Sequence, residues 1–242
     1  MENILLPSAI RIEAGHNPNE GILVVEPCFH GYGTTLGNAL RRVLLSSLTG
    51  AAVTAVRIKG ATHEFQAIDG VKEDVLEIIL NLKGLRLKCH SDQPVKLTLK
   101  AKGEGVVTAD DIDKNADVDI VNRDLKIATL TDAKATLEME ITVSRGRGYS
   151  PTEERHSEGA ELGTIAIDSL FSPVRTVGYK VENTRVGEIT NYDKLTMTIE
   201  TDGTITPDEA VKSAAKTLID YFSILLQDSA AEPAAKAEEA AE

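Results

Sequence analysis

The glycine-rich run at residues 31–37 is the feature of the sequence that could most directly do chemistry. It reads Gly-Tyr-Gly-Thr-Thr-Leu-Gly and stands before an apolar helical pattern. Backbone N–H groups at a helix N-terminus can bind a phosphate, so one hypothesis is a stand-alone nucleotide-binding enzyme that uses the Gly31–Gly37 loop. The run lacks a GKS or GKT sequence, and GxG spacing is common by chance, so a tight turn into the helix is the simpler interpretation.

Other residue arrangements that would indicate catalysis or a bound metal are not evident. The two cysteines, Cys28 and Cys89, form no CxxC pair and cannot build a tetrahedral zinc site alone. The sequence contains no HExxH run, and no spacing of Ser, His, Asp or Glu marks a catalytic group. We therefore expect no catalytic residue, metal or cofactor on this chain, and we favour a binding or assembly role.

The composition is that of an acidic globular protein. Among 242 residues, Lys and Arg total 26 and Asp and Glu total 38, and the net charge is −12. Aromatic residues make up 4%, with no Trp, so neither phosphate contacts nor base stacking is expected. The run Arg145 to Tyr149 (RGRGY) is too short for an RGG-type nucleic-acid segment, and a solvated loop over Arg145–Ser157 is expected. No signal peptide or 18-residue apolar stretch is present, which predicts a cytoplasmic protein.

The hydrophobic periodicity predicts an α+β fold. A helix is expected over Leu36–Leu48, with Thr34 or Thr35 as its N-cap. A second helix is expected to place Val71, Val75, Ile78, Ile79 and Leu82 on one face, with Glu73 and Asp74 in its first turns. Strands are expected over 5–13, 21–26 and 52–59, as antiparallel strands within 85–143, and over 164–168, 174–182 and 195–200.

The last helix has the strongest pattern. Thr206-Pro207-Asp208-Glu209 is a capping box with Pro at the first helical position. Its apolar residues then step by four and three, as in helix–helix packing at a shallow angle. The pattern favours a helix that covers the sheet of its own chain. The alternative is an oligomer interface, in which this helix packs against the Leu36–Leu48 helix of another copy. The seam consists of Val211, Ala215, Leu218, Phe222, Leu225 and Ser229.

Arg41 and Arg42 lie on a helix that is otherwise largely apolar. One interpretation is structural, with one side chain reaching solvent and the other paired with an acidic neighbour. The other is an anchor for a protein partner, because Arg is enriched in interface hot spots. The pattern does not decide between them.

Several motifs, in order over residues 4–227, together resemble the alpha-subunit family of bacterial RNA polymerases. Each is modest alone, and the combination is specific. The motifs are Thr35-Leu36-Gly37-Asn38-Ala39-Leu40-Arg41-Arg42, Leu44-Leu45-Ser46-Ser47, His63-Glu64-Phe65, Gly70-Val71-Lys72-Glu73-Asp74-Val75, Leu80-Asn81-Leu82-Lys83-Gly84, Val107-Thr108-Ala109-Asp110-Asp111-Ile112, Arg145-Gly146-Arg147-Gly148-Tyr149, Phe171-Ser172-Pro173-Val174, Asp193-Lys194-Leu195 and Asp202 to Ala210.

The resemblance implies a fold of two subdomains. Residues 1–49 and 173–228 would form a helix-bearing dimerisation subdomain. Residues 50–172 would form an inserted, mostly antiparallel β subdomain. Residues 229–242, rich in Ala and Glu, would be a linker or tail.

The resemblance also implies a function in the transcription of DNA into RNA. Alpha subunits of this family dimerise and serve as the assembly platform for the beta and beta-prime subunits. The large subunits hold the magnesium-dependent active site, so magnesium or zinc would belong to them, and this chain would be a non-catalytic subunit of DNA-directed RNA polymerase.

Site residues follow from the same resemblance. The dimer interface would consist of Leu36, Leu40, Val43, Leu44 and Ser47 with Val211, Ala215, Leu218, Phe222 and Leu225. The beta contact would consist of Arg42, Leu45 and Lys83, and the beta-prime contact of Ile167, Asp168, Ser172 and Pro173.

The sequence departs from the family in two places. Cys28-Phe29-His30 follows Glu26-Pro27, where the family usually has a run like Leu-Glu-Arg. The family also commonly continues into a small C-terminal domain that binds promoter DNA, whereas this sequence stops in what resembles the linker. We therefore expect the chain by itself to bind promoter DNA poorly.

Overall fold

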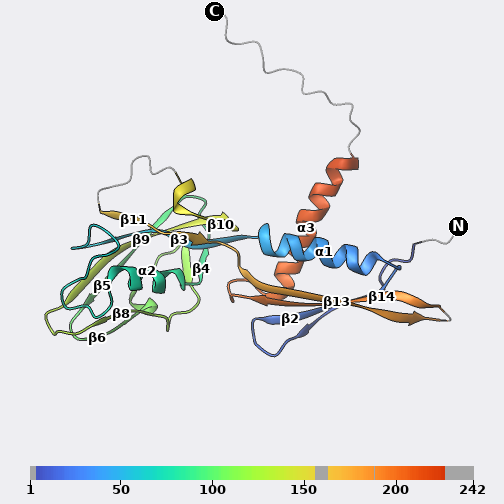
Figure 1. Ribbon diagram of the computed structural model, residues 1–242, viewed down its shortest axis with the longest axis horizontal. Helices are drawn as coiled ribbons and strands as arrows, with labels where there is room; N and C mark the ends of the chain where they lie inside the picture. Colours follow the sequence, from blue (N-terminus) through green and yellow to red (C-terminus); the bar gives the residue numbers. More distant parts are fainter. Residues whose placement is uncertain (1–3, 156–162, 188, 227–242) are drawn as a thin grey trace, which may run out of the picture.

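Two separate hydrophobic cores organise the chain in the computed structural model, which describes residues 4–155, 163–187 and 189–226. One core draws on residues 23–48 and 174–214, and the other on residues 53–167. Figure 1 shows them as two bodies along the longest axis. The boundaries predicted at 49/50 and 172/173 fall between the two cores. Two other predictions, the tail at 229–242 and the seam residue Ser229, lie outside the described residues.

The elements form an α+β fold, as predicted. The described residues contain three α-helices, namely α1 (Tyr32–Ser46), α2 (Val75–Lys83) and α3 (Pro207–Leu226). The strands are β1 (Ala9–Ala14), β2 (Glu20–Cys28), β3 (Thr49–Ile58), β4 (Leu87–Cys89), β5 (Val95–Lys102), β6 (Gly105–Thr108), β7 (Val118–Ile120), β8 (Lys126–Leu130), β9 (Thr136–Arg147), β10 (Tyr149–Ser150), β11 (Thr164–Ala166), β12 (Ser169–Leu170), β13 (Val174–Val186) and β14 (Ile189–Thr201).

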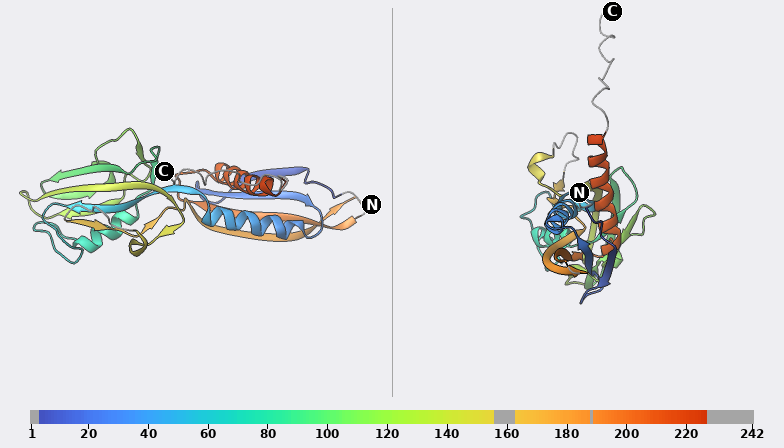
Figure 2. Two further views of the ribbon diagram at one scale, coloured as in Figure 1. Left: turned by 90° about the horizontal axis from the view of Figure 1, so that it is seen from above. Right: turned by 90° about the vertical axis from the view of Figure 1, so that its right-hand side faces the viewer.

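The first core lies between an antiparallel sheet and two helices. The sheet order is β1-β2-β14-β13, so β2, near the start of the chain, pairs with β14, near its end. Helix α1 packs on β13 and β14, and the start of α3 packs beside it over β14 and β2. Figure 2 shows α1 and α3 on the same face of this sheet. The inward side chains of β2 and β14, including Leu23, Val25, Leu195 and Met197, are buried beneath them.

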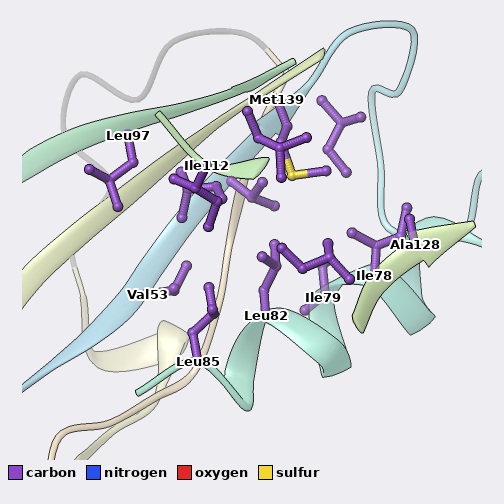
Figure 3. Packing of buried hydrophobic residues seen from close by; sticks show 14 of the residues in the cluster. Val53, Ile78, Ile79, Leu82, Leu85, Leu97, Ile112, Ala128 and Met139 are labelled. Carbon is purple, nitrogen blue, oxygen red and sulfur yellow. The ribbon is translucent and has the colours of Figure 1, made fainter. Parts of the chain in front are cut away.

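The second core is formed by residues 53–167, which lie in sequence between the two parts of the first core and are called the inserted subdomain below. Its sheet order is β5-β9-β3-β4-β7, with β11 paired to β3. Alternating residues of β9 and β5 are buried, as their period of two predicted. Helix α2 closes the core with its buried residues Ile78, Ile79 and Leu82, which Figure 3 shows facing the inward side chains of the sheet.

The structure corrects three local predictions. Helix α1 begins at Tyr32, because Gly31 takes the N-cap position at a φ of 85°, so neither Thr34 nor Thr35 is the N-cap. Helix α2 begins at Val75 with Asp74 as its N-cap, so Val71 and Glu73 precede the helix. The loop predicted from Arg145 is instead the end of β9, which stays paired with β3 up to Arg147 and Thr49.

Glu73 has a structural role that the helical prediction missed. Its side chain is buried between α2 and β8, where Thr129 N and Thr129 Oγ1 donate to the carboxylate at 2.6 and 2.9 Å. Lys126 Nζ forms an ion pair with it at 2.8 Å. Burial alone would raise the pKa of Glu73, but these donors together lower it below the ordinary glutamate value. The carboxylate therefore stabilises the folded chain in its charged form.

We expect Glu73→Gln to lower the free energy of unfolding at pH 7 by about 1–3 kcal/mol, because the amide cannot accept from all three donors. A carboxyl group with a lowered folded pKa contributes stability above its unfolded pKa and loses it as the pH falls through the folded pKa. The difference between the two proteins in urea unfolding at fixed protein concentration should therefore shrink as the pH falls below the ordinary glutamate pKa and on through the lowered pKa of Glu73. A difference that is constant with pH would contradict this role for Glu73.

Candidate functional site

The turn into α1 is held by a carboxylate from the far end of the chain. Gly31 N and Gly33 N both donate to Asp193 Oδ2, at 2.9 and 3.0 Å. Asp193 lies in β14 and is buried, beside Cys28. Burial, and secondarily the charge of Asp193, raises the pKa of the Cys28 thiol. The N–H groups of Gly31 and Gly33, which a bound phosphate would require as donors, thus already donate to a side chain of the same protein. This argues against nucleotide binding by the Gly31–Gly37 loop.

The glycines of this run serve close packing. A Cβ at Gly33 would lie 2.9 Å from side-chain atoms of Asp193 and Val181, and a Cβ at Gly37 would lie 2.7 Å from the ring of Tyr179. Both residues therefore let α1 approach the sheet. Phe29, in the run that departs from the family, lies edge-to-face between the rings of Tyr32 and Tyr192. This turn is a structural support for α1.

Helix α3 begins as predicted. Thr206 N donates to Glu209 Oε2 at 3.1 Å and Glu209 N donates to Thr206 Oγ1 at 3.3 Å, which completes the capping box. The backbone N–H and the hydroxyl of Thr206, which both donate to Glu209 Oε2, lower the pKa of Glu209. The face that α3 buries in its own chain differs from the predicted seam, because its fully buried residues are Ala210 and Ala214. Small residues there allow the helix to cross close to α1.

The last two turns of α3 expose large apolar side chains. Figure 1 shows this part of α3, in red, rising away from the rest of the chain. Its apolar residues surround the helix and do not form a single stripe, which is typical of a helix that is buried on several sides. The exposed fractions range from 59% to 85%, for Ile219, Tyr221, Phe222, Ile224, Leu225 and Leu226.

Helix α1 exposes less of its predicted dimer interface than the sequence suggested. Leu44 is fully buried in its own core, where it holds α1 on the sheet, so it is not available to a second copy. Leu36, Leu40 and Val43 are half-buried against the same core. Ser47 is half-buried, and its hydroxyl lies 3.1 Å from that of Ser46. Of the predicted seam on α3, Val211, Ala215 and Leu218 are half-buried, and Phe222 and Leu225 are exposed.

The guanidinium groups of Arg41 and Arg42 are exposed on the C-terminal half of α1. Within residues 4–155, 163–187 and 189–226, neither group forms an ion pair. The structural interpretation required an acidic partner for one of them. The arrangement favours the alternative, a cationic surface that is available to a protein partner.

Lys83 and Asp168, which the resemblance assigns to different partners, form an ion pair. Lys83 Nζ lies 3.3 Å from Asp168 Oδ2. The backbone N–H of Thr152 donates to the other carboxylate oxygen of Asp168 at 3.0 Å. The Thr152 N–H, followed by Lys83, lowers the pKa of Asp168. Both side chains are about one-third exposed, so the pair contributes little stability and can exchange for contacts with another protein.

The segment Ile167–Pro173 presents different side chains from those predicted. Ile167 is 1% exposed in the core of the inserted subdomain, and Pro173 is also buried, so neither is available at the surface. The Ser172 hydroxyl lies 3.2 Å from Leu45 O of α1 and 3.1 Å from Val174 O. Leu45 is itself half-buried. Of the predicted beta and beta-prime residues, Leu45 therefore adjoins Ser172 and Lys83 adjoins Asp168.

Sequence reasoning missed two exposed residues of this region, Leu170 and Tyr149. Both are large and apolar, and a two-residue strand gives too short a pattern for its outward face to be identified.

The described residues include no group of three or more His, Cys, Asp or Glu side chains placed to hold a metal. Among those residues, no helix has the length and apolar character needed to cross a membrane.

Known proteins similar to this chain were found in two ways. Residues 56–172 match the protein family described as "RNA polymerase Rpb3/RpoA insert domain". Three similar curated proteins are each named "DNA-directed RNA polymerase subunit alpha". The protein from Alkaliphilus oremlandii is 51% identical over 91% of this chain and 69% of its own length. Those from Oceanobacillus iheyensis and Moorella thermoacetica are 52% and 54% identical, over 93% and 89% of this chain and 72% and 69% of their own lengths.

Proposed function

The chain belongs to the family of DNA-directed RNA polymerase alpha subunits, and on that basis we propose that it forms a homodimer on which the beta and beta-prime subunits assemble. In this role the chain performs no nucleotidyl transfer and needs no metal or cofactor of its own. Its chemistry is the burial of apolar and cationic surface against other proteins.

The observation that carries the proposal is the exposed end of α3. Six large apolar side chains there are more than half exposed, because within the described residues α3 is buried at Ala210 and Ala214, in its first turns. Water-exposed apolar surface of this size is costly, and a second copy removes it by packing its own α1 and α3 against it. The isologous contact of a twofold dimer suits this arrangement, because each copy offers both a helix to bury and a partner surface.

Light scattering during size-exclusion chromatography tests the dimer. We expect a mass near twice 26.0 kDa at all accessible concentrations. Ordered addition of the beta subunit and then the beta-prime subunit tests the platform, with recovery of each on the tagged alpha chain as the readout. A stable monomer at high concentration would contradict the dimer, and a dimer that recovers neither large subunit would contradict the platform.

Arg42 is proposed as an anchor for the beta subunit. We expect Arg42→Ala to reduce recovery of beta about 30-fold or more, because the loss of a buried interfacial Arg typically costs 2 kcal/mol or more. The solution mass should stay that of a dimer, since the Arg42 side chain lies outside the core beneath α1.

Arg41→Ala is the matched control for this experiment, because Arg41 is the adjacent exposed arginine on the same helix. It should recover beta normally. Normal recovery by Arg42→Ala would show that the role assigned to Arg42 is wrong.

A further inference from the structure

The edge strand β1 and the residues before it carry apolar side chains that their own chain leaves uncovered. Ile10 of β1 is 69% exposed, and Leu6, in the stretch that leads into β1, is 78% exposed. Ile4 and Leu5 are exposed as well. Among the described residues of the body that holds the first core, only the end of α3 has a comparable group. This body therefore presents two apolar groups to water, one at β1 and one on α3.

Ile10 lies on the face of the sheet that carries α1 and α3. Directly opposed residues of antiparallel strands share a face, and Ile10 is paired with Val25, which is buried in the first core. Ile12, two residues later on the same face, is half-buried against that core. A Cβ at Gly21 would lie 2.6 Å from Pro207 and 3.5 Å from Ile12, so α3 begins over this part of β1. The helix-bearing face is therefore covered at Ile12 and uncovered at Ile10.

The opposite face of β1 holds its charges. Arg11 Nε donates to Glu13 Oε1 at 2.7 Å, and Arg11 Nη1 donates to Glu26 Oε1 at 2.8 Å. Side chains alternate across a strand, so Arg11 and Glu13 point away from the face on which Ile10 lies. A partner can therefore bury Ile10 without removing these charges from water.

The end of α3 has the length and the side chains to lie on this uncovered face in a second copy. Residues 219–226 extend for about 12 Å at a rise of about 1.5 Å per residue, which spans two to three strands at a spacing of about 4.8 Å. Large apolar side chains surround this part of the helix, so packing against other helices alone would leave one of its sides in water. A sheet face on that side completes the burial.

The size of the interface also favours a second copy as the occupant. A stable interface uses about 20–30 residues a side, and the six exposed apolar residues of α3 fall short of that number. Ile4, Leu5, Leu6 and Ile10 add apolar surface from the same body. The chain's own residues 227–242 are a poor occupant, because their sequence contains only Gln, Asp, Ser, Ala, Glu, Pro and Lys and offers no large apolar side chain.

We propose that in the dimer the end of α3 of each copy lies across Leu6 and Ile10 of the other copy. The inference rests on the proposed homodimer and deepens it, by naming β1 and the residues before it as the surface that receives α3. A twofold axis forms this contact twice, because the chain that receives one helix has its own helix received in return. The projecting helix and the uncovered strand are thus the two halves of one self-complementary interface.

Solution mass as a function of concentration, measured on the full chain, tests the contact. We expect Leu6→Ser/Ile10→Thr to raise the dissociation constant of the dimer at least about a hundredfold, because a twofold interface loses each apolar side chain twice. Threonine keeps a β-branched residue in the strand, and both original side chains are exposed in the single chain, so circular dichroism should show a folded protein. An unchanged dissociation constant would show that β1 lies outside the contact.

Arg11→Thr/Glu13→Ser is the matched control, because it changes the same strand on its opposite face. Exposed ion pairs contribute little stability, so the control should keep the dissociation constant of the unsubstituted protein. An equal loss of dimer in the control would mean that both variants act by weakening β1, and it would overturn the assignment to the apolar face.

Cross-linking tests the same contact by proximity. A chain with Ile10→Cys is co-expressed with a tagged chain with Leu225→Cys, and a short bismaleimide is added. We expect a tagged covalent pair of twice 26.0 kDa, whereas Val121→Cys on the inserted subdomain in place of Ile10→Cys should give none. The natural cysteines, Cys28 and Cys89, are buried and should stay unreacted in the folded protein.

The outcomes separate this inference from the proposed dimer. If the unsubstituted protein is a monomer, the dimer and the contact both fall. If it is a dimer and no covalent pair forms between the cysteine variants, the dimer stands and the contact of α3 with β1 is wrong, even where the Leu6→Ser/Ile10→Thr variant dimerises less tightly.

Discussion

Replacing Phe222 and Leu225 by aspartate is expected to convert the protein from a dimer of twice 26.0 kDa to a monomer of 26.0 kDa. The two side chains are 59% and 78% exposed in the single chain, so the substitution removes no contact within the described chain that holds its fold together. Burial of one such side chain is worth about 1.5–3 kcal/mol, and a twofold dimer loses four of them. The sum of about 6–12 kcal/mol weakens association by at least about ten-thousandfold, before the cost of burying the new charges is added.

The measurement is solution mass as a function of concentration, with circular dichroism to check that the monomer stays folded. Val106→Asp/Val121→Asp is the control, because these valines are 59% and 45% exposed on the inserted subdomain, away from α3. The control should remain a dimer. A dimeric Phe222→Asp/Leu225→Asp variant would show that the exposed end of α3 is not the contact.

The second large effect is expected at Asp193, through stability. Asp193→Ala removes the acceptor of the Gly31 and Gly33 N–H groups, of which Gly33 is buried and Gly31 is exposed. An unsatisfied buried donor costs about 1–3 kcal/mol, and water can satisfy the exposed Gly31 N–H, so we expect a loss of roughly 1–3 kcal/mol in the free energy of unfolding. Because α1 rests on this turn, the dimer and the recovery of beta should weaken with it.

Asp193→Asn separates the hydrogen bonds from the charge. The amide oxygen can accept from both N–H groups, so only the attraction between the carboxylate and the helix dipole is lost, about 0.3–2 kcal/mol. Both variants are compared with the unsubstituted protein by urea unfolding at one protein concentration. An alanine variant within about 0.5 kcal/mol of the unsubstituted protein, the range of ordinary surface substitutions, would refute the role of Asp193.

Features set by neighbours in sequence were predictable. The capping box of Thr206 and Glu209 was confirmed, because both partners lie within one helical turn. The alternation in β9 and β5 also matched the buried face. The class of the fold followed from these local patterns, together with motifs that occur in the order found in alpha subunits.

Features set by distant partners were not predictable. The periodicity of α3 does not say which side rests on its own chain, so Ala210 and Ala214 were missed as its inward face. No residue near Gly31 in the sequence indicates that its N–H donates to the carboxylate of Asp193, 162 positions later. Leu44 and Ile167 are apolar residues that a motif can place in an interface, whereas only the packed structure puts them inside the chain.

The pairing of β2 with β14 determines when each part of the protein can fold during synthesis. The core of the inserted subdomain draws only on residues 53–167, so it can close while the ribosome is still adding the following strands. Leu23 and Val25 of β2 must wait for their β14 partners Met197 and Leu195, about 170 residues later, which at about 5–20 residues per second leaves them uncovered on the nascent chain for roughly 9–35 s. The waiting strand is a candidate for chaperone binding. Because α3 is made after β14, a chain becomes competent to pair with a second copy only after every strand of its own sheet is in place.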